Sequence, residues 1–165
     1  MICGFNNNNS IISVERIEEE DIPLLGDYIL KNLNYYTFGR GFSYKKWKQR
    51  YADGWLKNYY KISDNGNVVG YFSFNSLKYN IVYSSLYFVD KKNINILYKA
   101  SVSFTSLHSN IKFIKFTTST PYSIMYSIHR FGAVIVDNED GFFDISIEID
   151  KIKKCNLYEE VIFES

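Results

Sequence analysis

The sequence contains little of what would place it in a specialised class of protein. Only two of its 165 residues are cysteines, and Cys3 and Cys155 lie near opposite ends of the chain. Neither stands at metal-ligand spacing from another cysteine or a histidine, which argues against a zinc site and against a disulfide framework. We therefore expect no bound metal, and the low cysteine content agrees with a reducing cytoplasm.

Long apolar runs are also missing. No uninterrupted apolar run approaches the roughly 20 residues of a membrane-spanning helix. The opening residues, MICGFNNNNS, lack the basic start and apolar core of a secretion signal. The formal net charge of +1 gives no overall sign of a nucleic-acid or membrane partner. We expect a soluble, cytoplasmic protein with no membrane partner.

Motifs of several large enzyme classes are absent as well. The sequence has no GxxxxGK[ST], no GxSxG, no HExxH and no DxDxDG calcium loop. One segment is locally basic and aromatic, since Lys45, Lys46, Lys48 and Arg50 alternate with tyrosine and tryptophan. This pattern is compatible with binding of single-stranded nucleic acid, but a solvated helix face is its commoner meaning.

Aromatic residues, in contrast, are plentiful. There are 15 tyrosines and 13 phenylalanines, and 46% of the residues are hydrophobic against 22% charged. This composition and length predict one globular domain over residues 1–165 with a single sizeable core. Within it, the run Asn6–Asn9 suggests a flexible leader over residues 1–10. Residues 151–165 form a C-terminal extension, in which LYEEVIF can add an edge strand.

The first part of the chain predicts one strand and two helices. Ile12 and Val14 in IISVERI lie on one face of a strand. EEEDIPLLGDYILKNL has acids and Pro23 at its start and then apolar residues at helical intervals, which predicts an amphipathic helix. Ser43 can cap a second helix, YKKWKQRYADGWLKNYY. A stripe of aromatic residues in it recurs at helical spacing, which favours a core-facing role over a ligand site: Tyr44, Trp47, Tyr51 and Trp55.

Strands dominate the middle of the chain. The runs YYKIS and VVGYFSFNSL flank DNGN, a strong signature of a hairpin, and NIVYSSLYFV predicts a third antiparallel strand. A helix follows from Ile94, and IKFIKFTTS is a strand that a helical crossover would place parallel to the preceding one. Thr120 and Pro121 start a last helix, which ends at Gly132 before a second hairpin around NEDG.

This order of elements resembles that of the GCN5-related N-acetyltransferase (GNAT) superfamily over most of residues 11–150. Two segments carry the resemblance. GNVVGYFSF after an Asn-Gly turn is like the family's third strand, and PYSIMYSIHRFGA is similar to its fourth helix. The resemblance implies an α/β (α+β) fold with a mixed, centrally splayed sheet flanked by about four helices.

The same resemblance implies a site for acyl-coenzyme A. In the family, the fourth and fifth strands run parallel but splay apart, and the pantetheine arm pairs with backbone groups between them. Here those strands would be Ile81–Val89 and Ile111–Ser119. The family's pyrophosphate loop, written Arg or Gln, x, x, Gly, x, Gly or Ala, corresponds to KKNINI at residues 91–96, which lacks both glycines and the customary arginine.

Two interpretations of this loop stay open. Asparagine tolerates left-handed backbone conformations and lysine supplies positive charge, so the loop can hold phosphate in another backbone shape. Alternatively, an asparagine caps the helix and the lysines are solvated. By resemblance, the residues assigned to acyl-CoA binding are Phe88, Val89, Lys91, Lys92, Asn93, Asn95 and Thr120.

The candidate catalytic residues are Tyr87 and Tyr126. The family often places the acid for the departing thiolate four residues before the glycine that ends the fourth helix, where this chain has Ile128, which cannot donate a proton. Tyr126 lies about 200° around the helix from that position. Tyr87 is the best polar candidate beside a thioester, although a buried structural tyrosine fits equally. The segment YYTFGRGFSY, residues 35–44, can line the acceptor site.

The primary hypothesis is an acyl-CoA-dependent N-acyltransferase, by resemblance an N-acetyltransferase. It would move an acyl group from acetyl-CoA or another acyl-CoA, its co-substrate, to an amine on a small molecule or peptide by direct attack. The alternative is a catalytically inactive GNAT-like domain that uses the cleft or the aromatic helices for binding. Nucleic-acid binding ranks last, and a homodimer stays open.

Overall fold

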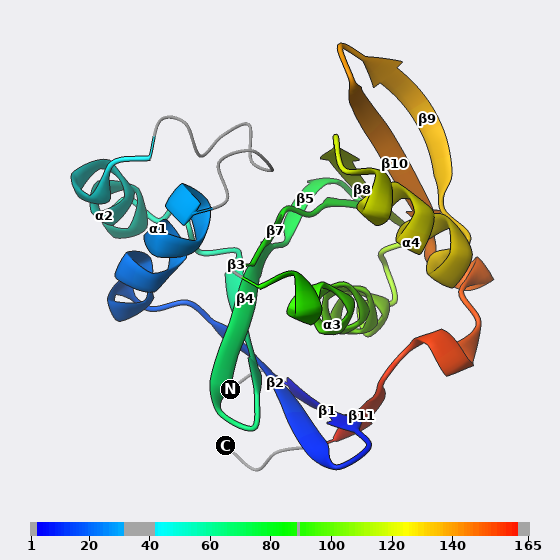
Figure 1. Ribbon diagram of the computed structural model, residues 1–165, viewed down its shortest axis with the longest axis horizontal. Coiled ribbons are helices and arrows are strands. Elements are labelled where there is room, and N and C mark those ends of the chain that lie inside the picture. The colour runs from blue at the N-terminus through cyan, green and yellow to red at the C-terminus, as the bar shows by residue number, and fades with distance from the viewer. Residues whose placement is uncertain (1–2, 32–41, 89, 162–165) are drawn as a thin grey trace.

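Backbone hydrogen bonds arrange the chain into two adjoining sheets with helices packed on them (Figure 1). The computed structural model describes residues 3–31, 42–88 and 90–161. The helices are α1 (Ile22–Lys31), α2 (Tyr44–Ala52), α3 (Ile94–Ser106) and α4 (Pro121–Phe131). The strands are β1 (Cys3–Asn7), β2 (Ser10–Arg16), β3 (Tyr59–Asp64), β4 (Asn67–Ser73), β5 (Asn75–Lys78), β6 (Ile81–Tyr83), β7 (Leu86–Tyr87), β8 (Phe113–Thr118), β9 (Val134–Glu139), β10 (Phe142–Glu148) and β11 (Glu159–Val161).

One sheet has the strand order β11-β1-β2-β3-β4-β7, and the other has the order β5-β6-β8-β10-β9. All pairs are antiparallel except β6 with β8, which are parallel and joined by the crossover through α3. The predicted mixed α/β fold with four flanking helices is confirmed. None of the helices in the described residues is both long and apolar enough to cross a membrane.

Local turn chemistry accounts for both predicted hairpins. Asn65 and Gly66 connect β3 to β4 with φ angles of 45° and 83°, and Asp140 and Gly141 connect β9 to β10 with 52° and 81°. Two successive left-handed residues are the requirement of the tight turn whose twist matches paired strands. Gly132, at φ 65°, ends α4 in the same left-handed region, as its position after the helix predicted.

Two expectations about segment boundaries are wrong, and one about an edge strand is right. The leader expected over residues 1–10 contains β1, which pairs with β2 on one side and with β11 on the other. β11 is the edge strand expected near the C-terminus. The second helix ends at Ala52, because Gly54 turns left-handed at φ 77°, and the next residues lead into β3. The aromatic stripe is therefore only partly core: Trp47 is 4% exposed, whereas Trp55 is 75% exposed.

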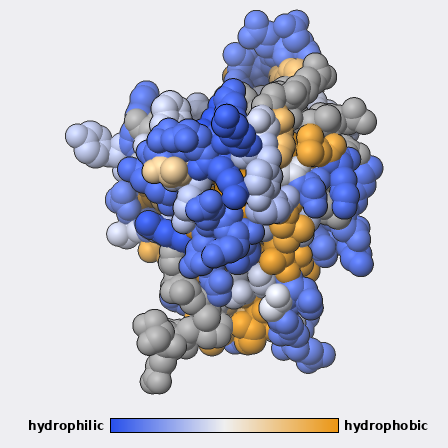
Figure 2. All heavy atoms as spheres, turned by 90° about the vertical axis from the view of Figure 1, so that its left-hand side faces the viewer, coloured by the Kyte–Doolittle hydropathy of each residue, from blue (hydrophilic) through white to orange (hydrophobic). Residues whose placement is uncertain are grey.

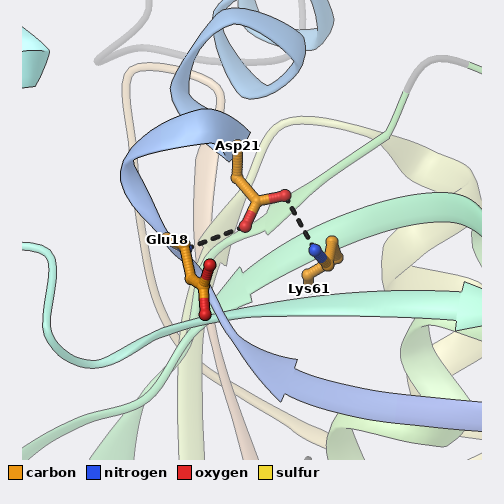
Figure 3. Close-up of polar contacts among 3 residues, drawn as sticks. All are labelled: Glu18, Asp21 and Lys61. Carbon is orange, nitrogen blue, oxygen red and sulfur yellow. Dashed lines mark hydrogen bonds and ion pairs between the residues drawn. The ribbon is translucent and has the colours of Figure 1, made fainter.

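A polar contact fixes where α1 begins on the sheet (Figure 3). Asp21 accepts a hydrogen bond from the backbone N–H of Glu18 at 2.8 Å, through one carboxylate oxygen. Its other oxygen accepts from Lys61 Nζ on β3 at 2.9 Å, and both side chains of this ion pair are largely shielded from solvent. The contact therefore ties the turn before α1 to the central strands.

The helices cover opposite faces of the first sheet, α1 and α2 on one side and α3 on the other (Figure 1). The larger apolar cluster includes residues of α3, β2 and β10, and the smaller one joins α1 and Trp47 of α2 to β4 and β7. Gly70 on β4 allows α3 to approach closely. A Cβ at this position would collide with a methyl group of Leu97 and would lie 2.5 Å from the carbonyl oxygen of Tyr87.

Replacement of Gly70 by alanine should therefore lower the free energy of unfolding by about 2–3 kcal/mol, the cost of overpacking a dense core. Urea denaturation followed by circular dichroism measures the change. The matched control is Gly54→Ala, where nothing lies within 4 Å of the added Cβ and only left-handed backbone strain of about 1 kcal/mol applies. A smaller loss for Gly70→Ala than for Gly54→Ala would contradict the close approach of α3.

Candidate active site

The candidate site begins where two parallel strands separate. β6 pairs with β8 from Ile81 opposite Phe113 to Tyr83 opposite Lys115. The last backbone hydrogen bond between these two segments is donated by the N–H of Ser84 to the carbonyl oxygen of Lys115, at 3.0 Å. Beyond it, β7 pairs only with β4 and is the edge strand of the first sheet. The strands therefore splay apart after Ser84.

The edge of β7 that faces β8 carries backbone groups with no strand partner. Ser85 binds β4 through both its backbone groups: its carbonyl oxygen accepts from Ser73 N–H, and its N–H donates to Ser73 Oγ. Backbone groups of successive strand residues point to opposite edges, so the N–H and C=O of Leu86 point toward β8. By the same alternation Thr117 on β8 faces back toward β7. Two strand edges thus face each other across an opening.

This opening is a cleft of about 320 Å3. Its walls come from β4, from the segment through β6 and β7, from α3, from β8 and from the start of α4. Hydroxyl groups are its commonest polar feature. The lining residues are Ser73, Asn75, Tyr83, Ser84, Ser85, Leu86, Tyr87, Phe88, Tyr98, Phe116, Thr117, Thr118, Thr120 and Ser123.

A second cavity, of about 450 Å3, adjoins the cleft at the start of α3. The two cavities share Phe88 and Thr120 in their walls. The helix starts on either side are linked, because Tyr122 at the start of α4 donates a hydrogen bond to Asn95 Oδ1 at 2.7 Å. The second cavity is lined by Phe88, Lys91, Lys92, Ile94, Asn95, Thr120 and Tyr122.

Most residues assigned to acyl-CoA binding therefore come together. Lys91, Lys92 and Asn95 line the second cavity, and the two shared residues join it to the cleft. Asn93 stands at the N-cap position of α3, but its side chain makes no capping hydrogen bond. Val89 lies outside the described residues.

The loop before α3 already holds an anion of its own. Asp90 Oδ1 accepts from the Lys92 N–H at 3.0 Å, and Asp90 Oδ2 lies 3.3 Å from Lys92 Nζ. These bonds, the backbone one foremost, lower the pKa of Asp90. The next two N–H groups are also used, since Asn93 and Ile94 donate to the carbonyl oxygens of Asp90 and Lys91. The backbone N–H groups of Lys92, Asn93 and Ile94 are therefore not available to an external anion, and the lysine side chains are the donors left at this loop.

The predicted catalytic residue Tyr87 has its backbone at the cleft and its side chain in the apolar cluster beneath α1 and α2. Its ring stacks on Tyr59 with centroids 6.1 Å apart, and the two hydroxyl groups share a hydrogen bond. Burial raises the pKa of Tyr59, although Tyr87 and the nearby charge of Arg50 oppose this rise. Tyr87 therefore belongs to a buried tyrosine pair on the side of the sheet where α2 lies.

The other candidate, Tyr126, is not among the described residues that line the cleft. Its ring lies 5.6 Å from that of Tyr98, which does line it. The hydroxyl of Tyr98 shares hydrogen bonds with Ser123 and Ser127, and burial raises its pKa to about 12. Sequence reasoning missed Tyr98, because its place among the apolar positions of α3 gave no sign that it faces two serines from another helix.

No carboxylate or histidine is found among the described residues that line the cleft. The ionisable groups there are tyrosines, and Tyr98 with its raised pKa stays protonated at neutral pH. The acceptor-site segment predicted over residues 35–44 falls largely outside the described residues, yet by sequence it too contains no acid and no histidine. The cleft is thus equipped to donate hydrogen bonds rather than to accept protons.

The basic, aromatic segment lies on α2, away from the cleft. A shallow hollow of about 500 Å3 there is lined by Ser43, Lys45, Lys46, Gln49, Arg50, Asp53 and Trp55. The side of the molecule on which α1 and α2 lie has a mainly hydrophilic surface (Figure 2). The arrangement agrees with a solvated helix face.

Comparison with solved structures identifies the fold. The spermidine N-acetyltransferase of Vibrio cholerae, in complex with CoA and spermine, superposes with a TM-score of 0.70 at 13% identity, covering 85% of this chain and 96% of that one. The N-acetyltransferase PseH of Campylobacter jejuni gives 0.62 at 11% identity, with 83% and 97% covered. RimL, a ribosomal L7/L12 alpha-N-protein acetyltransferase in complex with coenzyme A, gives 0.64 at 12% identity, with 88% and 96% covered.

The chain therefore has the GNAT fold, as the resemblance implied. No protein-family model matches the sequence, and no curated protein matches it either. The fold is thus conveyed by the three-dimensional arrangement at sequence identities of 10–14%. Two of the neighbours named above were crystallised with coenzyme A.

Asp90 should oppose the binding of phosphate groups in the second cavity. Asp90→Asn removes the negative charge but keeps an oxygen that can cap the turn, so we expect CoA to bind about 2- to 5-fold more tightly, the size of an exposed charge interaction. Isothermal titration calorimetry at low ionic strength measures the effect, which should shrink in 0.5 M salt because ions screen exposed charges.

The matched control is Asp137→Asn, which removes the same charge from the exposed strand β9. It should leave CoA affinity unchanged. Equal affinities for the wild type and Asp90→Asn at low salt would show that phosphate does not approach this loop.

Proposed function

We propose that the protein is an acyl-CoA-dependent N-acyltransferase, in which the cleft receives the pantetheine arm and the second cavity receives the phosphates. The observation that carries this proposal is that the two cavities adjoin, with Phe88 and Thr120 in the walls of both. One end has strand edges with unused backbone groups at Leu86 and Thr117, and the other end has Lys91 and Lys92. An arm with amide groups and a phosphate terminus matches this sequence of environments.

The fit can be followed along the cleft. The edge of β7 at Leu86 offers one N–H and one C=O to an amide-containing chain, in the way that a further strand would pair. Phe88 and Thr120 stand at the junction of the cavities. Lys91 and Lys92 supply positive charge in place of the missing glycines, and Asn95 supplies further polar contact.

The acyl-CoA would supply an activated acyl group, whose carbonyl carbon forms a bond to the acceptor nitrogen while its bond to sulfur breaks. Tyr98, at the cleft wall, can turn its hydroxyl group away from Ser123 and Ser127 and donate a hydrogen bond to the sulfur as its negative charge grows. Its pKa of about 12 means that it stays largely protonated beside a thiolate, so it stabilises by hydrogen bonding. We propose this role for Tyr98 in preference to Tyr126.

The amine acceptor would approach from the side of the sheet that carries α1 and α2. Tyr87 and Tyr59 lie beneath this side. Their shared hydrogen bond fixes the Tyr87 ring, and Tyr87 would in turn help to position the acceptor. Spermine accompanies CoA in the Vibrio cholerae neighbour, and RimL is named an alpha-N-protein acetyltransferase. A small-molecule or peptide amine is accordingly the acceptor class that we propose.

The pH dependence of the rate should follow the pKa of the acceptor's amine group. Tyr59 and Tyr98 have raised pKa values and stay protonated below pH 9, and no described lining residue can act as a base near neutrality. We expect log(kcat/KM) to rise by one for each pH unit up to the pKa of the acceptor's amine, near 8 for a peptide N-terminus and near 10.4 for a lysine-like amine.

Steady-state kinetics with two acceptors of these kinds, each run from pH 6 to 9, measures the profile. The peptide acceptor should give a plateau near pH 8, and the lysine-like acceptor should give none in this range. A shared inflection between pH 6 and 7 for both acceptors would reveal a base on the protein and contradict the proposed mechanism.

Binding of acyl-CoA is the direct test of the proposed function. Calorimetry and thermal shift with acetyl-CoA and longer acyl-CoAs should detect binding to the wild type. Replacing Lys91, Lys92 and Asn93 together by alanine should weaken it at least 10-fold, because two cations leave the phosphate cavity. The matched control replaces Lys45 and Lys46 on α2, which removes the same charge elsewhere.

The outcomes separate the two functional hypotheses. Binding together with release of free CoA that depends on an added amine supports the transferase. Binding without such release, across small amines and peptides, supports an inactive GNAT-like domain. If no acyl-CoA binds at millimolar concentration, the proposed function is refuted.

A further inference from the structure

One buried polar atom beside the cleft has no hydrogen-bond partner within the protein. This atom is the hydroxyl oxygen of Ser84. Ser84 lines the cleft and also a void of about 10 Å3 behind it, which is at the bottom of the range that one water molecule needs. Apart from Ser84, the void is lined mainly by apolar side chains. Buried hydroxyl groups nearly always have partners, and a molecule bound in the cleft that Ser84 lines could supply one.

Ser84 also lies where strand pairing between β6 and β8 stops. From Ser84 to Phe88 the chain lines the cleft, and Phe88 also lines the second cavity with the two lysines. At about 3.3 Å per residue, these four steps cover at most roughly 13 Å. A pantetheine arm that extends over this distance from the second cavity would place its reactive end in the region of Ser84.

The backbone around Ser84 has no N–H to offer at this point. Ser84 N–H donates to the Lys115 carbonyl oxygen, and Ser85 N–H donates to Ser73 Oγ. At the point where strand pairing stops, the side chain of Ser84 is thus an unused donor, and the next unused donor along this wall is the N–H of Leu86.

We propose that the Ser84 hydroxyl donates a hydrogen bond to the carbonyl oxygen of the acyl group. This inference rests on the proposed function and adds a specific donor to it. The oxygen gains negative charge as the acceptor nitrogen bonds to the carbonyl carbon, and a hydrogen bond from the Ser84 hydroxyl would stabilise that charge. It also distinguishes a ligand that carries an acyl group from free CoA, which has no carbonyl at its sulfur.

The test compares acetyl-CoA with CoA by calorimetry on the whole protein. Ser84→Ala should bind acetyl-CoA about 3- to 10-fold more weakly than the wild type and bind CoA within twofold of it, because only the acyl carbonyl loses a donor. Ser84→Thr keeps a hydroxyl and should retain the wild-type ratio of the two affinities.

Stability gives an independent readout without ligand. Since the hydroxyl has no partner in the free protein, Ser84→Ala should not lower the melting temperature. The matched control is Ser103→Ala, a buried serine outside the cleft whose Oγ accepts from Tyr158 N–H at 2.9 Å. It should lower the melting temperature by about 2–4 °C and leave both affinities unchanged.

Each result bears on a different claim. If the wild type binds neither ligand, the proposed function itself fails. If the wild type binds both and Ser84→Ala binds both equally well, the function stands and the role of Ser84 is refuted. Equal weakening for both ligands would also refute it, because the hydroxyl would then contact the arm and not the acyl group.

Discussion

The loss of hydrogen bonding between the two parallel strands after Ser84 and Lys115 is the constraint on which the candidate site depends. A backbone group that loses its strand partner needs another one, because an unpaired buried peptide group costs free energy. β7 remains held by β4 through two residue pairs, and Gly70 lets α3 pack closely beneath both. The packing thus keeps an edge open that would otherwise pair with β8, and it produces the cleft.

The loop before α3 borders a cavity with two lysines and has no glycine. Glycine-rich loops bind phosphate through backbone N–H groups, which need backbone conformations that β-branched residues adopt only at a cost. Here those groups are used internally, one of them by Asp90. In the function that we propose, Lys91 and Lys92 supply the positive charge instead, so that binding of phosphate would depend on charge attraction and on salt more than on backbone geometry.

The chemistry of the cleft follows from its hydroxyl groups. Tyr98 and the serines and threonines around it donate hydrogen bonds, whereas no described lining residue carries a carboxylate or an imidazole. In the reaction that we propose, such a site can stabilise charge that develops on oxygen or sulfur, and the acceptor amine must arrive without its extra proton. Burial strengthens this division of roles, since it raises the pKa of Tyr98 and Tyr59 and keeps both protonated.

The sequence by itself determined the features that neighbouring residues encode: both hairpins, the start and end of α4, the parallel direction of β8 and the fold class. By resemblance, it also assigned Lys91, Lys92 and Thr120 to one site, and all three line the second cavity. This was possible because a strand-to-helix junction is a local feature. Only the tertiary structure decided that Cys3–Asn7 is a strand, that Tyr98 meets Ser123, and that the Ser84 hydroxyl has no partner. The physical reason is distance along the chain: these facts depend on which remote segments pack together, and no local pattern of residues records that.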